Sequence, residues 1–89
     1  MPRYKVYLSK RADKFLSEQF EGLRLRILEE TRDFENFPFL IASHDLAKIK
    51  GKEGYYRLRV GDIRLILKID KARRVIYVEK IGRREAIYQ

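Results

Sequence analysis

The stretch YYRLRVGDIRLI, residues 55–66, decides the fold of this chain. At its centre is a Gly-Asp pair, Gly61 and Asp62, which suits the two-residue turns that join twisted antiparallel strands. Counting outward from this pair places each residue of the first strand opposite one residue of the second. The stretch therefore predicts a β-hairpin in which Arg59 lies directly opposite Arg64.

The predicted hairpin has one basic face and one apolar face, because side chains alternate along a strand. Like charges directly opposite one another destabilise a sheet by roughly a few tenths of a kcal/mol or more. Three clustered arginines are therefore expected to bind an anion that offsets their repulsion. The basic face is expected to hold Arg57, Arg59 and Arg64, and the apolar face Leu58, Val60, Ile63 and Leu65.

The chain is basic, and its charge is unevenly distributed. It has 89 residues, of which 45% are hydrophobic, and a formal net charge of +8. This length and composition predict one globular domain over residues 1–89 rather than a disordered chain. Residues 44–89 hold 13 of the 21 Lys and Arg residues but only 6 of the 13 Asp and Glu residues. The excess in this half indicates a polyanion, such as a nucleic acid, or an acidic protein as the partner.

Several kinds of site lack the residues that they need. The chain has no Cys, which excludes disulfides and thiolate chemistry, and its one histidine, His44, cannot form a His-based metal cluster. The five glycines are scattered singly and form no phosphate-binding loop. The sequence shows no long apolar run and no signal-peptide pattern. We therefore expect a cytoplasmic protein that uses no metal or other cofactor and has no membrane partner.

Upstream of the hairpin, the apolar spacing predicts one strand and two helices. Residues 4–8 alternate as a strand does, and Ser9 is placed to cap a first helix. Gly22 is expected to break the chain before a second helix, which Asn36 and Pro38 end. The first helix is expected to bury Ala12, Phe15, Leu16 and Phe20, and the second Leu23, Ile27, Leu28 and Phe34.

Two further strands are predicted to flank the hairpin. Residues 46–50 alternate, with Lys48 and Lys50 on one face, and residues 74–81 follow a turn around residues 70–73. The resulting element order is β-α-α-β-β-β. The fold class is therefore expected to be α+β, with a twisted antiparallel sheet and a helix pair packed on its apolar face.

The tyrosines of the basic half are candidates for contacts with nucleic acid. Aromatic rings interleaved with Arg and Lys can stack on unpaired bases while the cations hold phosphates. Tyr56 and Tyr77 are better explained as ordinary strand residues. Tyr88 differs, because it follows Arg83 and Arg84 without the periodic apolar pattern that a core would need.

Three motifs together resemble the RelE/ParE superfamily of toxin–antitoxin systems, and more closely its RelE-like branch. They are KIKG at residues 48–51, the hairpin stretch at residues 55–66, and IGRREAIY at residues 81–88. The resemblance covers nearly the whole chain and implies a first strand, a helix pair and a curved antiparallel sheet. It also implies a ribosome-dependent endoribonuclease that cuts mRNA in the decoding site. A cognate, RelB-like antitoxin would hold this toxin inactive.

The resemblance also implies a set of catalytic residues. Arg57 and Arg59 match two basic residues on the sheet strands of the family, although lysines are the better-known residues there. Arg64 matches an arginine after the turn, which is shorter here. Arg84 and Tyr88 match a final Arg and Tyr, with the neighbouring Arg83 as the alternative to Arg84. Further cations are expected to bind the RNA, namely Lys48, Lys50, Lys52 and Arg83.

Cleavage through the neighbouring 2′-hydroxyl needs a base, stabilisation of the phosphorane charge, and protonation of the departing 5′-oxygen. Arginine forks match phosphate oxygens and stay charged. Tyr88 is the expected general base, because nearby cations favour tyrosinate, and Arg84 is expected to be a phosphate ligand or acid. The products would carry 5′-hydroxyl and 2′,3′-cyclic phosphate ends. The ribosome would have to orient the substrate.

A phosphate site would also affect the stability of the free protein. If Arg59 and Arg64 only repel each other there, replacing either should leave stability unchanged or raise it by roughly 0.2 to 1 kcal/mol. Two other functions stay open from the sequence. One is a ParE-like, non-enzymatic inhibitor of a DNA topoisomerase, which does not need the arginine and tyrosine set, and the other is an inactive RNA-binding relative.

Overall fold

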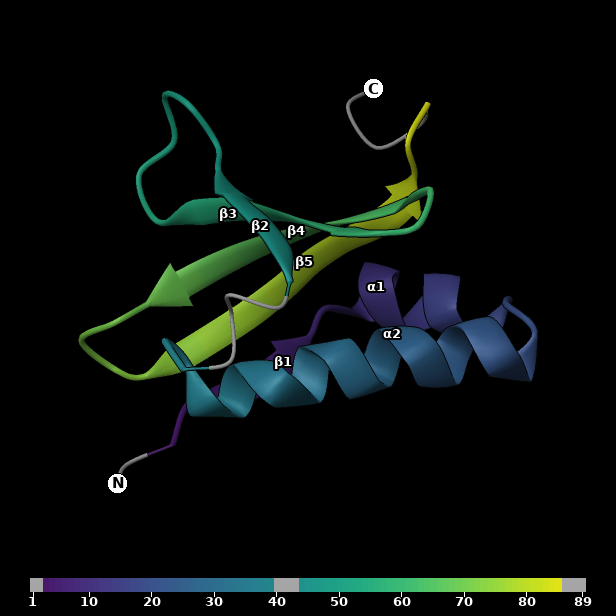
Figure 1. The fold of residues 1–89 in the computed structure, drawn as a ribbon, viewed down its shortest axis with the longest axis horizontal. Helices are drawn as coiled ribbons and strands as arrows, with labels where there is room; N and C mark the ends of the chain where they lie inside the picture. Colours follow the sequence, from purple (N-terminus) through teal and green to yellow (C-terminus); the bar gives the residue numbers. More distant parts are fainter. Residues whose placement is uncertain (1–2, 40–43, 86–89) are drawn as a thin grey trace.

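The computed structural model describes residues 3–39 and 44–85, and these form an α+β fold (Figure 1). Two α-helices follow the first strand, as predicted. Four strands come after them, one for each segment predicted there, which is one strand more than the order β-α-α-β-β-β contains. The elements are β1 (Lys5–Leu8), α1 (Lys10–Ser17), α2 (Glu21–Asp33), the short 3-10 helix η1 (Phe34–Asn36), β2 (Asp45–Lys48), β3 (Tyr55–Val60), β4 (Ile63–Asp70) and β5 (Val75–Arg83).

The strands form one sheet with the order β1-β5-β4-β3-β2. Strands β2 to β5 pair antiparallel, as predicted, whereas β1 pairs parallel to β5. The sheet is therefore mixed. Figure 1 shows β1 beside β5. Along the chain, the two helices come after β1 and before the other four strands. Apolar alternation predicted β1 as a strand but carries no information on its neighbour or direction.

The hairpin has the predicted register. Val60 pairs with Ile63 and Arg59 with Arg64, which leaves Gly61 and Asp62 as the turn. Gly61 has φ of 62°, whereas Asp62 keeps a negative φ. A positive φ at the first central residue alone is the mark of a type II′ turn, for which glycine is the favoured residue.

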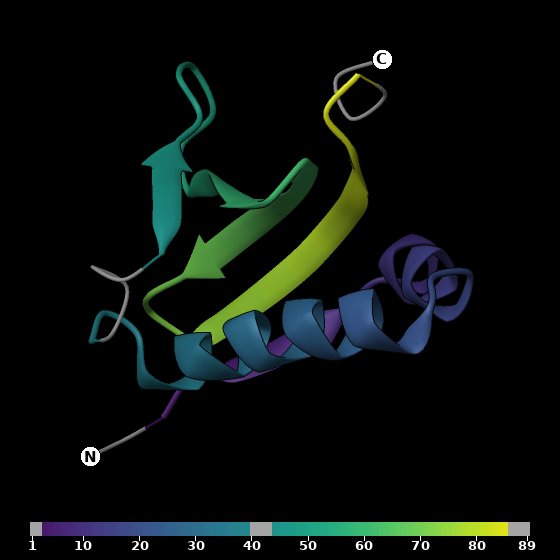
Figure 2. The ribbon, with the colours of Figure 1, turned by 45° about the vertical axis from the view of Figure 1, so that its right-hand side comes forward.

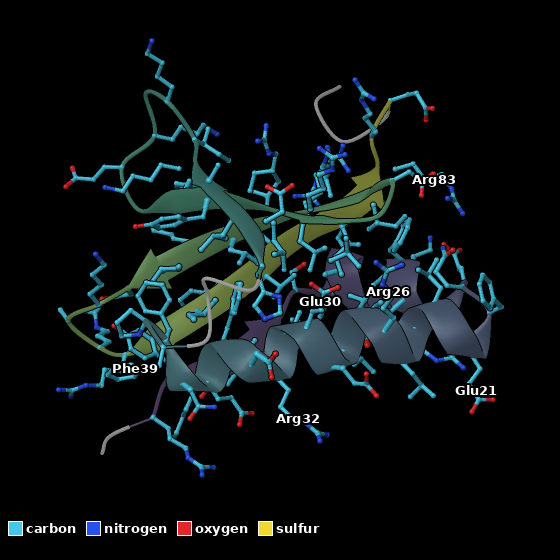
Figure 3. All side chains as sticks on the ribbon, viewed as in Figure 1. Glu21, Arg26, Glu30, Arg32, Phe39 and Arg83 are labelled. Carbon is cyan, nitrogen blue, oxygen red and sulfur yellow. The ribbon has the colours of Figure 1, made fainter. Side chains whose placement is uncertain are left out.

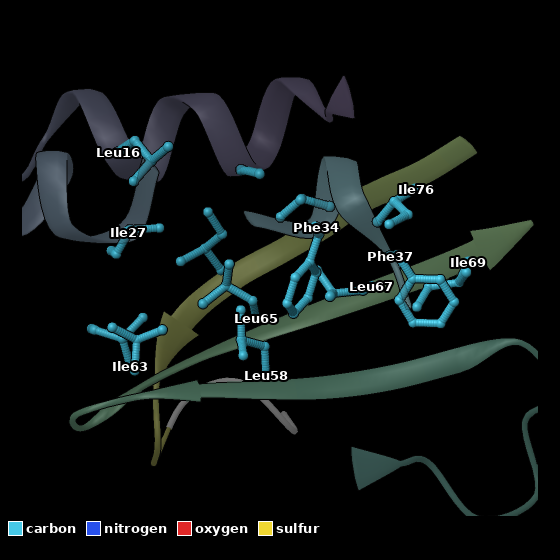
Figure 4. Packing of buried hydrophobic residues seen from close by; sticks show 14 residues of the cluster. Leu16, Ile27, Phe34, Phe37, Leu58, Ile63, Leu65, Leu67, Ile69 and Ile76 are labelled. Atoms are coloured by element: carbon cyan, nitrogen blue, oxygen red, sulfur yellow. The ribbon is translucent and has the colours of Figure 1, made fainter. Parts of the chain in front are cut away.

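The core lies between the sheet and the two helices, which cover the same face (Figure 2). Leu58 and Leu65 from the hairpin are fully buried there, as their alternation predicts. Figure 4 shows how these leucines meet Phe34 from η1 and Ile27 from α2. The buried apolar residues are Ala12, Leu16, Ile27, Phe34, Phe37, Leu58, Val60, Ile63, Leu65, Leu67, Ile69, Ile76, Val78 and Ile81.

Ser9 caps α1 and also joins it to the sheet. Its Oγ accepts a hydrogen bond from the Ala12 N–H at 3.0 Å, the cap that the sequence predicts. The same hydroxyl donates to the Glu79 carbonyl of β5 at 2.8 Å. The β4–β5 register shifts between Ile66 and Leu67, and Glu79 is the extra residue on β5. A bulge leaves a backbone group outside the ladder, and Ser9 satisfies one here.

Some predicted boundaries are wrong. Helix α1 ends at Ser17, so Phe20 is not on its apolar stripe but forms the N-cap position of α2 and is 73% exposed. Gly22 lies within the first turn of α2, and the chain breaks before it, at residues 18–20. The extended backbone of Phe20, with φ of −66° and ψ of 157°, causes the break. Strand β2 covers residues 45–48 rather than 46–50.

Within residues 3–39 and 44–85, neither helix combines the length and the apolar character that crossing a membrane requires.

Candidate nucleic-acid interface

Three arginines lie together on the sheet face opposite the helices, and we call them the arginine patch. Arg57 and Arg59 come from β3 and Arg64 from β4. Their strand neighbours Leu58 and Leu65 are buried on the helix-covered face, which directs the arginines to the other side. Residues directly opposite in a sheet have Cβ atoms about 5 Å apart, so Arg59 and Arg64 are close neighbours.

Arg64 is the most enclosed residue of the arginine patch, with only 7% of its surface exposed. Its Nη1 donates to the Gly61 carbonyl at 3.0 Å and to the Ile63 carbonyl at 3.1 Å. The guanidinium therefore folds back over the hairpin turn. This arrangement contradicts the expectation that Arg64 only repels Arg59 in the free protein, because Arg64 also stabilises the turn.

Arg59 is exposed and lies near one carboxylate. Its Nε is 3.7 Å from Oδ2 of Asp45, the residue opposite it on β2, and both side chains are more than half exposed. Exposed ion pairs of this kind contribute little stability, because water screens them. Arg59 can therefore exchange Asp45 for another anion at small cost.

Arg57 has an unsatisfied polar atom. Its Nε is buried and has no hydrogen-bond partner among the residues that the structure describes. The cause is visible in the register, because Arg57 lies between Ala47 on β2 and Ile66 on β4, whose side chains cannot accept a hydrogen bond. A buried donor without an acceptor costs about 1–3 kcal/mol. An anion bound at the arginine patch would supply the missing acceptor.

The two candidate arginines at the end of β5 differ in their contacts. Nη1 of Arg83 lies 3.4 Å from Oδ2 of Asp62 in the hairpin turn (Figure 3). Arg83 is opposite Ile63 in register, and hence on the core side of the strand. The Arg84 N–H donates to the Asp62 carbonyl at 3.0 Å, and its exposed side chain forms no ion pair within the described part of the chain. Tyr88 lies outside the described residues.

The lysines predicted to bind RNA gather at the other end of the hairpin. Lys48, Lys50 and Lys52 line an open groove of about 1030 Å³ together with Tyr55. Lys48 shares its strand face with Leu46, which pairs with Leu58, so it lies on the opposite face from the arginine patch. Because β2 ends at Lys48, Lys50 belongs to the following turn, and the two lysines do not share a strand face as predicted.

His44 has a structural role. Its side chain is 6% exposed, with Nδ1 2.9 Å from Glu30 Oε1 and Nε2 3.0 Å from Asp33 Oδ2. Glu30 projects from the side of α2 that faces the sheet (Figure 3). The imidazole also meets the Phe34 ring edge to face, at 5.4 Å between centroids. His44 therefore fixes the start of β2 onto α2, away from the arginine patch.

The chemistry of the arginine patch is that of an anion site. Guanidinium forks match phosphate oxygens and keep their charge, but they are poor proton carriers. Asp45 is a carboxylate beside the arginine patch, and it is paired with Arg59. No group of His, Cys, Asp and Glu that could hold a metal ion occurs among the described residues. The described part of the site can bind and stabilise phosphate charge, and a proton-transfer group must come from elsewhere.

Comparison with solved structures finds the same fold in several proteins. The RelE–RelB complex of Pyrococcus horikoshii OT3 contains a chain with a TM-score of 0.81 and 28% identity, over 97% of this chain and 99% of that chain. The RelB–RelE complex of Methanococcus jannaschii gives a TM-score of 0.74 and 27% identity, over 93% and 95% of the two chains.

The isolated RelE toxin of E. coli is similar in fold alone. It gives a TM-score of 0.73 and 18% identity, over 90% of this chain and 83% of that chain. No protein-family model matches the sequence, and no curated protein matches it either. The similarity is thus carried by the three-dimensional arrangement of the elements, over nearly the full length of both archaeal chains.

Proposed function

Because this chain has the fold of the RelE-like toxin superfamily, we propose that it is the toxin of a type II toxin–antitoxin system and cleaves mRNA on the ribosome. The arginine patch is the proposed site of cleavage. The observation that carries the proposal is Arg57 Nε, a buried donor for which the described residues provide no acceptor, on a face that holds two more guanidinium groups.

The proposed reaction is attack by the 2′-hydroxyl on the neighbouring phosphorus. The O2′–P bond forms and the P–O5′ bond breaks, which leaves a 2′,3′-cyclic phosphate and a 5′-hydroxyl. Arg57, Arg59 and Arg64 would stabilise the charge of the phosphorane, as preorganised donors do in other enzymes. Tyr88 would accept the proton of the 2′-hydroxyl, and Arg84 would bind the phosphate or protonate the 5′-oxygen.

Arg84 is the better of the two late arginines for this role. Arg83 already contacts Asp62 and lies on the core side of β5, whereas the Arg84 side chain has no such ion pair among the described residues. Arg83 would then hold the hairpin turn close to the end of β5. Lys48, Lys50 and Lys52 would contact RNA outside the cleaved bond.

The proposed partners follow from the same comparison and from charge. The two archaeal structures are complexes of RelE with RelB, and we infer a cognate antitoxin for this chain. The net charge of +8 favours an acidic antitoxin segment that covers the basic sheet face. The ribosome would orient the mRNA, because arginines alone provide no proton shuttle near neutral pH.

The test is a translation reaction with purified protein, in which the 5′ ends of the mRNA are mapped. We expect new 5′-hydroxyl ends only when ribosomes are present. Arg57→Gln should reduce cleavage about 100-fold, the scale of losing one donor to a transition-state charge. The matched control is Arg73→Gln, because Arg73 is exposed and lies in the β4–β5 turn. Equally fast cleavage of naked RNA, or an unaffected Arg57→Gln variant, would contradict the proposal.

A supercoiling assay with a DNA topoisomerase, run in parallel with the translation assay, tests the alternative function. A ParE-like inhibitor would block supercoiling and leave mRNA intact, and replacing the arginine patch would not be expected to matter. We expect that the parent protein does not inhibit supercoiling and that the Arg57→Gln variant loses mRNA cleavage.

A further inference from the structure

A second feature of the face opposite the helices is a row of side chains that crosses four strands. Tyr7 on β1 pairs in register with Tyr77 on β5, Tyr77 pairs with Lys68 on β4, and Lys68 pairs with Tyr55 on β3. These four residues are the tyrosine–lysine row. Neighbouring strands lie about 4.8 Å apart, so the row spans about 14 Å.

One end of the row is an exposed pair of rings. Tyr7 and Tyr77 stack with centroids 5.9 Å apart and an angle of 24° between the planes. They are 48% and 42% exposed, although large aromatic side chains are usually more buried than this. They also line a shallow hollow of about 510 Å³, to which Arg11 contributes a cation and Glu79 a carboxylate. The pair therefore offers flat apolar surface to a ligand.

The other end of the row is a tyrosine with two lysines close to its ring. Lys52 Nζ lies 5.2 Å from the centroid of the Tyr55 ring, and Lys68 Nζ lies 5.4 Å from it. Tyr55 belongs to the 1030 Å³ groove described above. Among the residues that line this groove, lysines outnumber carboxylates five to two, and Asp70 is already engaged by Arg73. The lysines are Lys48, Lys50, Lys52, Lys68 and Lys71.

The row continues directly into the arginine patch. Tyr55 and Arg57 lie on the same face of β3, two residues apart, which corresponds to about 7 Å along the strand. A chain of nucleotides that placed one phosphate at the arginine patch could therefore reach Tyr55 with its neighbours. Exposed aromatic residues on a sheet that stack two or three bases are an established way to bind single-stranded RNA.

We propose that the tyrosine–lysine row binds single-stranded RNA. Bases stack on Tyr55, Tyr77 and Tyr7, and Lys68 holds a phosphate between them. The row deepens the proposed function, on which its biological role rests, because it would hold nucleotides that flank the cleaved bond. We favour RNA over an acidic protein because the row combines exposed rings, on which bases can stack, with lysines that can hold phosphates.

The binding test uses the whole chain and a 2′-O-methyl oligonucleotide, which has no 2′-hydroxyl and cannot be cleaved. Tyr77→Thr and Tyr7→Thr keep the preference for strands but remove the rings. Each is expected to weaken binding about tenfold, the effect of losing one base–aromatic stack. The matched control is Phe20→Ala, which removes a more exposed aromatic ring at the start of α2. It should bind as the parent does.

Lys68→Gln tests the electrostatic part. Removing one phosphate contact should reduce the slope of log K against log salt by about 0.7 for a single strand. Lys14→Gln, an exposed lysine of α1, should leave the slope unchanged. A duplex of the same sequence should bind more weakly than the single strand, because its bases are not available for stacking.

Three outcomes would overturn the inference. The first is that the Tyr7→Thr/Tyr77→Thr double variant binds the oligonucleotide as the parent does. The second is that duplex and single strand bind equally well. The third is that the double variant loses binding to an acidic peptide but keeps binding to RNA. The last result would assign the row to a protein partner. The binding test and the translation assay can fail separately. If the parent cleaves mRNA but does not bind the oligonucleotide, only this inference is wrong. If the parent binds the oligonucleotide through the row but does not cleave mRNA, only the proposed function is wrong.

Discussion

Arg59 and Arg64 face each other across the hairpin, yet the structure gives them different surroundings. Arg64 folds over the turn and is buried, whereas Arg59 extends to Asp45 at the surface. Their pairing could be predicted from the sequence, because turn chemistry and side-chain alternation are local. Their surroundings could not be, since the burial of Arg64 depends on strands that the sequence does not place beside it.

These surroundings predict opposite results for two similar substitutions. Arg64→Gln should lower the free energy of unfolding by about 1–2 kcal/mol, because the Gly61 and Ile63 carbonyls lose a charged donor. Arg59→Gln should change it by less than about 0.5 kcal/mol, since it removes only an exposed ion pair. Urea unfolding measures both. Equal stability of the two variants would show that the contacts of Arg64 with the turn are not stabilising.

At the scale of the elements, α1 depends on the sheet through Ser9. Ser9→Ala removes both the cap to Ala12 and the hydrogen bond to the Glu79 carbonyl. We expect a loss of about 2 kcal/mol, more than a helix cap alone usually gives. Ser17→Ala is the control, because the exposed Ser17 hydroxyl bonds only within α1, and it should be nearly neutral. A loss for Ser9→Ala no greater than for Ser17→Ala would contradict this account.

The β4–β5 turn should respond to pH through Asp70. The Arg73 N–H, which donates to this carboxylate at 3.1 Å, holds the pKa of Asp70 below its usual value of 3.8, and the Arg73 side chain acts in the same direction. Folding thus favours the charged form of Asp70. The ionised carboxylate therefore stabilises the folded protein above pH 3.8, and this contribution is lost as the pH falls through the lowered pKa. Asp70→Asn should therefore melt below the parent near neutral pH, and the gap in Tm should narrow below pH 3.8.

The elements also show where prediction from sequence ends. The hairpin, the cap of α1 and the strand character of β5 rest on patterns a few residues long, and they are confirmed. The parallel pairing of β1 and the exposure of Phe20 were not predicted, because each depends on contacts with distant segments. Lys48 is separated from the arginine patch because it shares its strand face with Leu46, and Lys50 lies beyond the early end of β2.

For the whole molecule, His44 is a polar link between the sheet and the helix layer. It joins the beginning of β2 to Glu30 and Asp33 of α2. His44→Ala should lower the free energy of unfolding by about 1–3 kcal/mol, because two hydrogen bonds to carboxylates and an aromatic contact are lost. Glu29→Gln on the exposed side of α2 is the control and should be neutral. Unchanged stability of His44→Ala would mean that the link is not needed.

The parallel contact between β1 and β5 has a consequence for the making of the protein. Partners such as Tyr7 and Tyr77 are 70 positions apart, and β5 is the last described element to be translated. Until it emerges, β1 has no strand to pair with, Ser9 lacks its hydrogen-bond partner on β5, and the tyrosine–lysine row is incomplete. A nascent chain is therefore expected to complete this RNA-binding surface only after β5 has left the ribosome and paired with β1.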